Sequence, residues 1–295
     1  MKKYAVFGNA FGWHSEQLLK AFAKKNIPAD FVGIEQLNHS IGITVPKHFG
    51  ETGNHALPMS KYGGILYRGI PSGSLEEVIY HMDALFALES AGVKIINSPK
   101  SIEKTVDKYL TLVLLENADL PVPPTCCCKT LESAKEAFYT FGEDVLYKPL
   151  FGSCGKGVAR IKTETELIRV FETCKKDGRV FYLQKFIPSG NADLRAFVIN
   201  GRIIASIKRM GKDWLSNISC GGIATPYSLS PYEEELSMRA AKAVSADIAG
   251  VDLLSSEEGQ IYVTEVNGCP GWKGLSAATG ISISDEIVNY LISNT

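Results

Sequence analysis

The first 97 residues alternate short apolar runs with segments of helical periodicity, and this alternation constrains the fold more than any other feature of the sequence. Four apolar runs of strand length lie at residues 3–7, 31–34, 64–67 and 93–96. Helical patterns follow the first run, around Leu18 to Ala23, and the third run, over residues 75–91. Strands that alternate with helices are typical of a parallel sheet. We therefore expect an N-terminal α/β domain over residues 1–97, with residues 38–62 as a long surface connection.

The pattern between residues 98 and 183 predicts a second α/β unit. A helix is expected after Pro99, with apolar positions that include Val106 and Leu114, and it ends before the proline-rich segment 120–124. A helix over 131–141, a strand over 145–150, a strand over 158–161 and a helix over 164–174 follow. We expect this unit to carry the glycine-rich loop that joins its two strands.

Residues 184–295 predict an α+β unit. Strands are expected over 181–187, 194–199 and 203–209. Asn200-Gly201 between the last two strands is a strong hairpin signal, because both residues tolerate a positive φ. A helix over 231–249 precedes strands over 251–254 and 260–266. The whole chain is thus expected to be α/β, with α+β character in its C-terminal part.

The charge balance and the cysteine pattern exclude several classes of function. The 31 Lys and Arg nearly cancel the 32 Asp and Glu, so no global positive field recruits nucleic acid or an anionic membrane. No stretch has the length and apolarity of a membrane span, and we expect a cytoplasmic protein. Seven cysteines without metal-knuckle spacing are expected to be reduced thiols. All five histidines precede residue 82, which argues against a histidine triad or zinc site among the later motifs.

The segment DVLYKPLFGSCGKGV predicts a phosphate-binding turn. Lys148 ends a β-type run, and the following turn contains Gly152, Ser153, Gly155 and Gly157. Backbone N–H groups exposed by glycines bind phosphate oxygens, and a lysine on the adjoining strand adds a positive charge. The spacing differs from that of a Walker P-loop, and a glycine turn between strands can also be only a hairpin.

The segment GVDLLSSEEGQIYVTEVNGCPGW predicts a metal site. Glu265 and Asn267 stand two residues apart on one strand and so face the same way, and Asp252 on the preceding strand can join them. Two carboxylates and an amide oxygen suit Mg²⁺ or Mn²⁺ between protein and nucleotide phosphates. The alternative is a solvated strand face. Separately, we expect residues 1–97 to form the acceptor-side domain, in which Arg68 follows the strand at 64–67 and could clamp the acceptor carboxylate or be a surface charge.

Taken together, these motifs resemble the ATP-grasp superfamily, and within it the RimK-like amide ligases, over about residues 95–295. Lys108 matches the first ATP-phosphate lysine of the family and Lys148 the second. The segment YLQKFI matches the hinge whose backbone groups bind the adenine edge, namely Gln184, Lys185, Phe186 and Ile187. Family members often have Glu at the position of Lys185, a change that backbone recognition tolerates.

The same resemblance implies roles for a further segment, NADLRAFVINGRIIASIKRMGKDWLSNISCGG. The matching residues are Asp193, Arg195, Arg209, Asn217, Gly221 and Gly222. The resemblance places Asp193 on the nucleotide side and Arg195 near the incoming carboxylate or phosphates. Arg209 and Asn217 would contact the transferring phosphoryl group and the acyl phosphate, and Gly221 and Gly222 the substrate.

The implied reaction joins a carboxylate to an amine at the expense of ATP, with two Mg²⁺ or Mn²⁺ ions. A carboxylate is a poor electrophile, so it is first converted to an acyl phosphate that the amine attacks. The loop GSCGKGV resembles the branch that adds L-glutamate, and EVNGCPGWKGLSAATGI resembles the enzymes that act on tetrahydromethanopterin or a deazaflavin coenzyme. A small-molecule or peptide carboxylate is the expected acceptor, and a homo-oligomer is left open.

Three other functions are alternatives to this one. An ATP-grasp kinase would release ADP without an amino acid. A non-catalytic nucleotide-binding module would not need three metal ligands. A dinucleotide oxidoreductase built on GNAFGWH is disfavoured, because that segment lacks the spacing of the third glycine.

Overall fold

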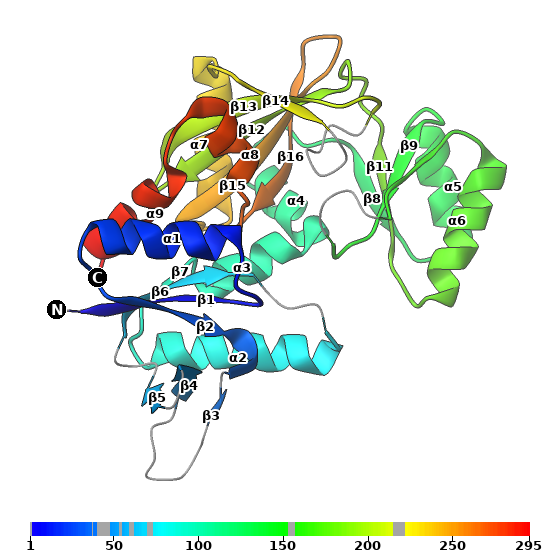
Figure 1. Ribbon diagram of the computed structural model, residues 1–295. Helices are drawn as coiled ribbons and strands as arrows, with labels where there is room; N and C mark the ends of the chain where they lie inside the picture. The colour runs from blue at the N-terminus through cyan, green and yellow to red at the C-terminus, as the bar shows by residue number, and fades with distance from the viewer. Residues whose placement is uncertain are drawn as a thin grey trace.

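The computed structural model describes residues 2–36, 38–39, 48–52, 55–58, 62–69, 73–152, 157–214 and 222–295. Three larger sheets organise these residues, and Figure 1 shows one of them, with its two helices, standing apart from the other two. No described helix is both long and apolar enough to cross a membrane.

The N-terminal sheet is parallel, as the strand–helix alternation predicts. Its strand order is β2-β1-β6-β7, and the strands are β1 (Lys3–Gly8), β2 (Ala29–Gly33), β6 (Tyr62–Arg68) and β7 (Ile95–Ile96). Helices α1 (Trp13–Lys24) and α2 (Leu75–Ser90) cover its two faces (Figure 1). Alternate residues of β1 accordingly face different cores: Val6 packs with α1, and Phe7 packs with α2.

The expected surface connection over residues 38–62 contains a small antiparallel sheet. After a 3₁₀ turn at Ile34–Gln36 come β3 (Asn38–His39), β4 (His48–Thr52) and β5 (His55–Pro58). The sequence analysis did not predict these three short strands within the connection. Their residues lack the apolar runs that mark buried strands.

The single helix expected after Pro99 is two helices, α3 (Pro99–Val106) and α4 (Lys108–Glu116). Asp107 separates them with an extended backbone, φ −90° and ψ 109°. Its carboxylate accepts hydrogen bonds from the N–H groups of Tyr109 and Leu110, at 2.8 and 3.1 Å. A side chain that caps the second helix thus replaces the continuous helical ladder. The break places Lys108 in the first turn of α4.

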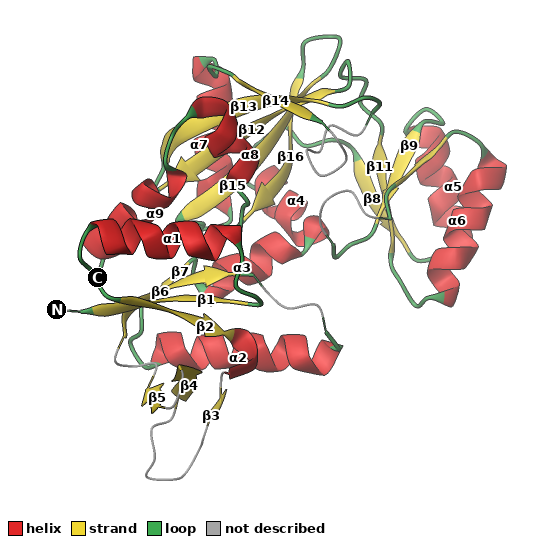
Figure 2. Ribbon diagram, viewed as in Figure 1, coloured by secondary structure: helices red, strands yellow, loops and turns green. Residues whose placement is uncertain are grey.

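Residues 125–185 form the separate lobe, which we call the small lobe. Its antiparallel sheet has the order β10-β9-β11-β8, with strands β8 (Thr125–Cys128), β9 (Val145–Lys148), β10 (Ala159–Ile161) and β11 (Phe181–Lys185). Helices α5 (Leu131–Thr140) and α6 (Glu164–Lys176) pack on this sheet (Figure 2). The predicted domain boundary at 183/184 falls inside β11, and both boundaries remain a prediction.

The C-terminal sheet is antiparallel with the order β14-β13-β12-β15-β16. Its strands are β12 (Ala192–Ile199), β13 (Arg202–Met210), β14 (Ile223–Pro226), β15 (Ile248–Ser255) and β16 (Ile261–Asn267). Asn200 and Gly201 make the hairpin turn with φ of 48° and 68°, so that prediction is confirmed.

Helices cover both faces of the C-terminal sheet. Helix α7 (Pro231–Ala243) covers one face, while α8 (Lys273–Thr279) and α9 (Ile283–Ser293) pack with α1 against the other. The prediction that the first of these helices reaches residue 249 is wrong. The chain turns at Ser245, whose φ is 59°, and β15 begins three residues later.

Candidate active site

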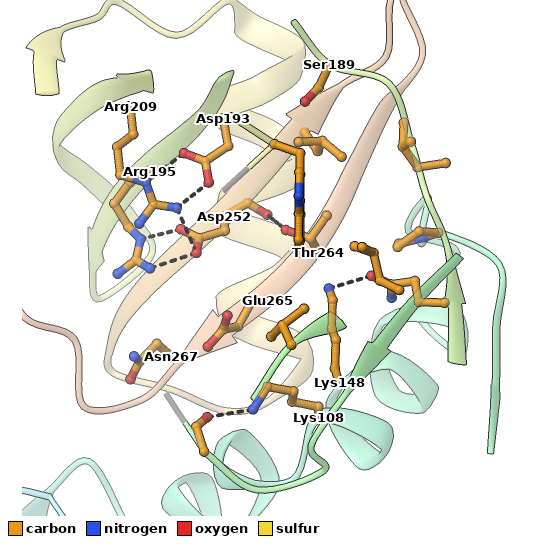
Figure 3. A pocket seen from close by; sticks show the side chains of 18 of the residues that line it. Lys108, Lys148, Ser189, Asp193, Arg195, Arg209, Asp252, Thr264, Glu265 and Asn267 are labelled. Atoms are coloured by element: carbon orange, nitrogen blue, oxygen red, sulfur yellow. Dashed lines mark hydrogen bonds and ion pairs between the residues drawn. The ribbon is translucent and has the colours of Figure 1, made fainter. Parts of the chain in front are cut away.

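A cavity of about 390 Å³ opens between the small lobe and the C-terminal sheet (Figure 3). Its lining residues include Lys108, Lys148, Gly152, Gln184, Lys185, Phe186, Ile187, Asp193, Arg195, Arg209, Asp252, Glu265 and Asn267. The fold therefore brings most of the residues chosen from the sequence into one space. Gly157, Gly222 and Arg68 are described but do not line this cavity. Ser153, Gly155, Asn217 and Gly221 lie outside the described residues.

Two lysines lie on the same side of the cavity, and each is already oriented by a hydrogen bond. Lys148 Nζ, at the end of β9, donates to Gln184 Oε1 at 2.6 Å. Gln184 is itself held because its Nε2 donates to Thr125 Oγ1 at 2.9 Å. Lys108 Nζ donates to the carbonyl of Gly152 at 2.6 Å. The ammonium groups are thereby positioned before a ligand arrives, which lowers the entropic cost of binding an anion.

Enclosure makes both ammonium groups easier to deprotonate than a lysine in water. Burial lowers the pKa of Lys148 to about 8, with the nearby Glu265 carboxylate opposing and the Lys108 ammonium assisting the shift. Burial also lowers the pKa of Lys108, against the attraction of Glu265 and Asp107. A polyanion placed between the two lysines would be strongly attracted, because the two charges lack a close carboxylate partner of their own among the described residues.

Carboxylates face these lysines from the C-terminal sheet (Figure 3). Asp252 on β15 and Glu265 on β16 are directly paired across the two strands, and a register shift follows Asp252. Among the described residues, none forms a hydrogen bond or ion pair with the side chain of Glu265. Asn267 Oδ1 accepts a hydrogen bond from the N–H of Cys269 at 2.9 Å. The three residues chosen as metal ligands therefore share one face of the sheet, on the neighbouring strands β15 and β16.

Asp252 belongs to a buried network of two acids and two arginines. It accepts hydrogen bonds from Arg195 Nε and from Arg195 Nη2, the latter at 2.7 Å, and Arg209 Nη2 lies 3.0 Å from its Oδ2. Arg209 also binds Asp193 through Nε and Nη2, each at 2.6 Å. Burial alone would raise the pKa of Asp252, but the two guanidinium groups hold it below its ordinary value. The network thus fixes the arginines at the floor of the cavity in their charged forms.

The donor set fits a hard divalent cation. Asp252 and Glu265 offer carboxylate oxygens and Asn267 an amide oxygen, which are the ligand types that Mg²⁺ prefers. Within the described part of the chain, no group of three or more His, Cys, Asp and Glu side chains gathers as a metal site. The site therefore suits an ion that takes its remaining ligands from phosphates and water, since two carboxylates alone do not complete a coordination shell.

The other end of the cavity is apolar and offers free backbone groups. Leu146, Phe186 and Ile187 line it. The N–H groups of Lys185 and Phe186 already donate to backbone carbonyls, at 2.8 and 2.9 Å, whereas the N–H of Ile187 has no backbone partner in the described chain. The Arg160 guanidinium stacks 3.4 Å from the Phe186 ring centre. A flat aromatic base with one acceptor at its edge would fit this end.

His14 was missed by the sequence analysis. The expectation that the histidines lie away from the later motifs is wrong in space, because His14 lines the cavity. Its Nε2 accepts a hydrogen bond from the N–H of Trp272, 258 residues away in sequence, at 3.1 Å. Burial, followed by the charges of Arg68 and Lys273, lowers the pKa of His14 to about 4. The available signal was GNAFGWH, which follows the first strand of a parallel sheet, where such sheets bind ligands.

Solved structures with the same arrangement of sheets identify the fold class. The structure of the ATP-grasp ligase PsnB complexed with minimal precursor, Mg and ADP aligns over 98% of this chain and 97% of that chain, with a TM-score of 0.74 at 18% identity. A lysine from helix α4, a lysine from the small-lobe sheet and carboxylates from the C-terminal sheet, all lining a single cavity, are thus set on the ATP-grasp fold. The predicted fold class is confirmed.

Sequence similarity then gives the family. Residues 105–291 match the RimK-like ATP-grasp domain. The chain is 32% identical over 262 residues to the tetrahydromethanopterin:alpha-L-glutamate ligase of Methanosarcina acetivorans, covering 79% of this chain and 81% of that protein. It is 34% identical over 229 residues to a probable alpha-L-glutamate ligase of Trichodesmium erythraeum, covering 76% of each. The chain belongs to the RimK-like ATP-grasp family, as the motifs predict.

Proposed function

We propose that this protein is a cytoplasmic ligase that uses ATP and Mg²⁺ to join the amine of L-glutamate to a carboxylate, releasing ADP and phosphate. The observation that carries the proposal is the cavity itself, in which Lys108 and Lys148 face Asp252 and Glu265. Both named relatives are alpha-L-glutamate ligases, which supports glutamate as the amine substrate. The acceptor is a coenzyme acid, such as a tetrahydromethanopterin or deazaflavin derivative, or a peptide carboxylate.

The side chains of the cavity divide the work of phosphoryl transfer. Lys108 and Lys148 hold the triphosphate, and the apolar end at Phe186 and Ile187 takes the adenine. Asp252, Glu265 and Asn267 would hold two Mg²⁺ ions, which supply neutralisation of phosphate charge when bound. We assign the glycine loop, including Gly152, to phosphate contacts.

Arg195 and Arg209 stabilise the acceptor's carbonyl group while it is activated and attacked. The acceptor carboxylate attacks the γ-phosphorus, an O–P bond forms, and ADP leaves. The amine then attacks the acyl carbon, a C–N bond forms, the C–O bond to phosphate breaks, and the proton of the amine passes to the departing phosphate. Arg209 and Arg195, with Asn217, stabilise the negative charge that develops on the carbonyl oxygen. Because Arg209 is fixed by two carboxylates, it needs little reorganisation during the reaction.

A substrate screen tests the proposal. ADP formation is measured with ATP, Mg²⁺ and a panel of coenzyme acids and peptides, each with and without L-glutamate, and products are weighed by mass spectrometry. We expect ADP release that requires both substrates and a product heavier by one or more glutamyl residues. ADP release with an acceptor but no amino acid would instead indicate a kinase. Omission of Mg²⁺ by chelation should abolish turnover.

A further inference from the structure

One end of the cavity has positively charged residues that are not among those assigned to phosphate or metal binding. His14, Lys273 and Gly274 line this end, where the carboxyl ends of β1 and β6 meet the loop before α8. Gly8 of β1 and Arg68 of β6 are paired neighbours in the parallel sheet, so the segment that leads to His14 starts beside Arg68. This end therefore joins the N-terminal sheet to the cavity.

His14 is fixed in one orientation and one tautomer. Its Nε2 accepts a hydrogen bond from the backbone N–H of Trp272 at 3.1 Å. Its ring also contacts the Trp272 ring edge to face, with ring centroids 4.6 Å apart and ring planes at 80°. A neutral imidazole that accepts at Nε2 carries its proton at Nδ1. His14 therefore offers the cavity a hydrogen-bond donor whose ring is already positioned. Burial and the neighbouring positive charges keep the ring neutral near pH 7.

The cations that lie over the Trp272 and Trp13 rings lack a compensating acid among the described residues. The Arg68 guanidinium lies 4.5 Å above the Trp272 ring, and its buried Nε has no hydrogen-bond partner. Lys273 Nζ lies 5.9 Å from the Trp13 ring. Within the described chain, neither cation forms an ion pair, whereas Arg195 and Arg209 are each bound to an aspartate. The excess positive charge near His14 is thus free to attract an anion.

We propose that His14 and Lys273, with Arg68 behind Trp272, form a subsite for a carboxylate of the amino acid that supplies the amine. The inference rests on the proposed ligase function and adds to it the place where the amine substrate is recognised. His14 Nδ1–H and the Lys273 ammonium donate to the carboxylate. Arg68 is a positioning residue, because it lies outside the cavity lining and acts through Trp272 and through its charge.

The amine substrate fits this end better than the acceptor does. The acceptor carboxylate has to reach the phosphate that is transferred, and so belongs near Lys148 and Glu265. A carboxylate held at His14 leaves that region open, while the amine on the same molecule can extend toward it. L-Glutamate has an α-carboxylate and a γ-carboxylate, and the subsite chemistry suits either one.

Two substitutions of His14 separate its donor from its acceptor role. His14→Gln can place an amide oxygen near the Nε2 position, which keeps an acceptor for the Trp272 N–H but removes the Nδ1–H donor. His14→Asn keeps a donor near Nδ1 and removes the acceptor. Lys273→Met removes the cation with similar length. Lys25→Met is the matched control, because Lys25 is an exposed lysine just after α1 and far from the cavity lining.

Calorimetric titration of L-glutamate into each protein, with and without ADP and Mg²⁺, tests the subsite. We expect His14→Gln and Lys273→Met each to weaken glutamate binding by about tenfold or more, since each removes a hydrogen bond to a charged group. His14→Asn should retain more affinity than His14→Gln, and Lys25→Met should match the wild type. All variants should bind ADP as the wild type does.

The positioning role of Arg68 is tested by a separate measurement, the titration of His14. Arg68→Gln should alter the NMR titration of His14, moving its pKa up from about 4, while the contact between the His14 and Trp272 rings persists. Arg68→Lys, which keeps the charge, should restore the low pKa. The other charged group that faces His14 from a packed element is Lys273. An unchanged His14 titration in Arg68→Gln would remove Arg68 from the subsite.

Analogues decide which carboxylate is held. If L-glutamine binds like L-glutamate and the α-amide of glutamate does not, the subsite takes the α-carboxylate, and the reverse result assigns the γ-carboxylate. The proposal is overturned if both amides bind as well as glutamate, or if His14→Gln and Lys273→Met bind glutamate normally. A wild-type protein that binds ADP but no glutamate also overturns it. Failure of the wild type to bind ADP would instead count against the ligase function.

Discussion

The small lobe and the rest of the molecule enclose the same cavity but are stabilised differently. Every residue of the small lobe's core, from Cys128 to Leu183, lies within the lobe itself. The core under the N-terminal sheet instead includes Phe22 of α1 together with Phe197, Trp272 and Leu291 from the C-terminal part. The N-terminal and C-terminal parts therefore form one packed body, and the small lobe is attached to it by two chain connections (Figure 1).

This difference assigns separate tasks to the two sides of the cavity. Lys148 and Phe186 belong to or adjoin the small lobe, while the acids, the arginines and His14 belong to the body. Because the lobe has its own core, it can change its angle to the body while that core stays intact, and Tyr182 of β11 is the buried lobe residue that packs with the body. Closure of the lobe over a nucleotide would bring its lysine toward the carboxylates and exclude water from the reactive phosphate.

Core truncation gives the largest expected effect and tests whether the lobe is independent. Phe138→Ala in the lobe and Phe22→Ala in the body each remove a fully buried ring and should each cost about 3–5 kcal/mol. Under mild urea, hydrogen exchange should rise in Phe138→Ala only within residues 125–185. In Phe22→Ala it should rise in N-terminal and C-terminal segments together. Uniform exchange across the whole chain of Phe138→Ala would refute the independence of the lobe.

The two acids proposed as metal ligands, Asp252 and Glu265, should differ in what they stabilise. Asp252→Ala leaves Arg195 and Arg209 without their shared buried carboxylate, so we expect the free energy of unfolding to fall by about 3–5 kcal/mol. Glu265→Gln should keep its stability, because no described ion pair depends on it, yet it should lose Mg²⁺-dependent turnover. Urea denaturation and ADP release measure the two effects. Equal stability of the two variants would show that the two arginines do not depend on Asp252.

Removal of the lobe lysine should impair catalysis without unfolding either region. Lys148→Ala should reduce turnover by about 10² or more, because the transferring phosphoryl group loses a fixed positive charge. Lys176→Ala is the matched control, since Lys176 is an exposed lysine at the end of α6 on the same lobe. Steady-state ADP release and a thermal unfolding curve are recorded for both variants. Turnover by Lys148→Ala at the wild-type rate would withdraw the assigned role.

The sequence predicted what depends on local pattern. The parallel N-terminal strands follow from apolar periodicity, and the Asn200-Gly201 hairpin follows from turn chemistry. Glu265 and Asn267 were found together because residues two apart on a strand share a face. Each of these inferences needs only neighbours in sequence and the known period of the element.

What the sequence did not predict depends on contacts between distant segments or on a competing local bond. His14 reaches the cavity only because the N–H of Trp272 holds it from the opposite end of the chain. The break between α3 and α4 depends on Asp107 bonding the next helix, a cap that the continuous apolar pattern obscured. The pairing of Arg209 with Asp193 across β12 and β13 requires the register of the two strands, which no single motif gives.

The smallest predicted effect concerns pH and separates the lobe lysine from the arginines of the body. Because the pKa of Lys148 is lowered to about 8, the free protein loses this charge as pH rises above that value. Affinity for ADP should therefore be nearly constant below about pH 7 and fall by about tenfold between about pH 7 and about pH 9. Lys148→Arg keeps its charge over this range and should bind ADP with little dependence on pH. The same decline in Lys148→Arg would assign the titration to another group, of which Lys108 is the first candidate because burial lowers its pKa as well.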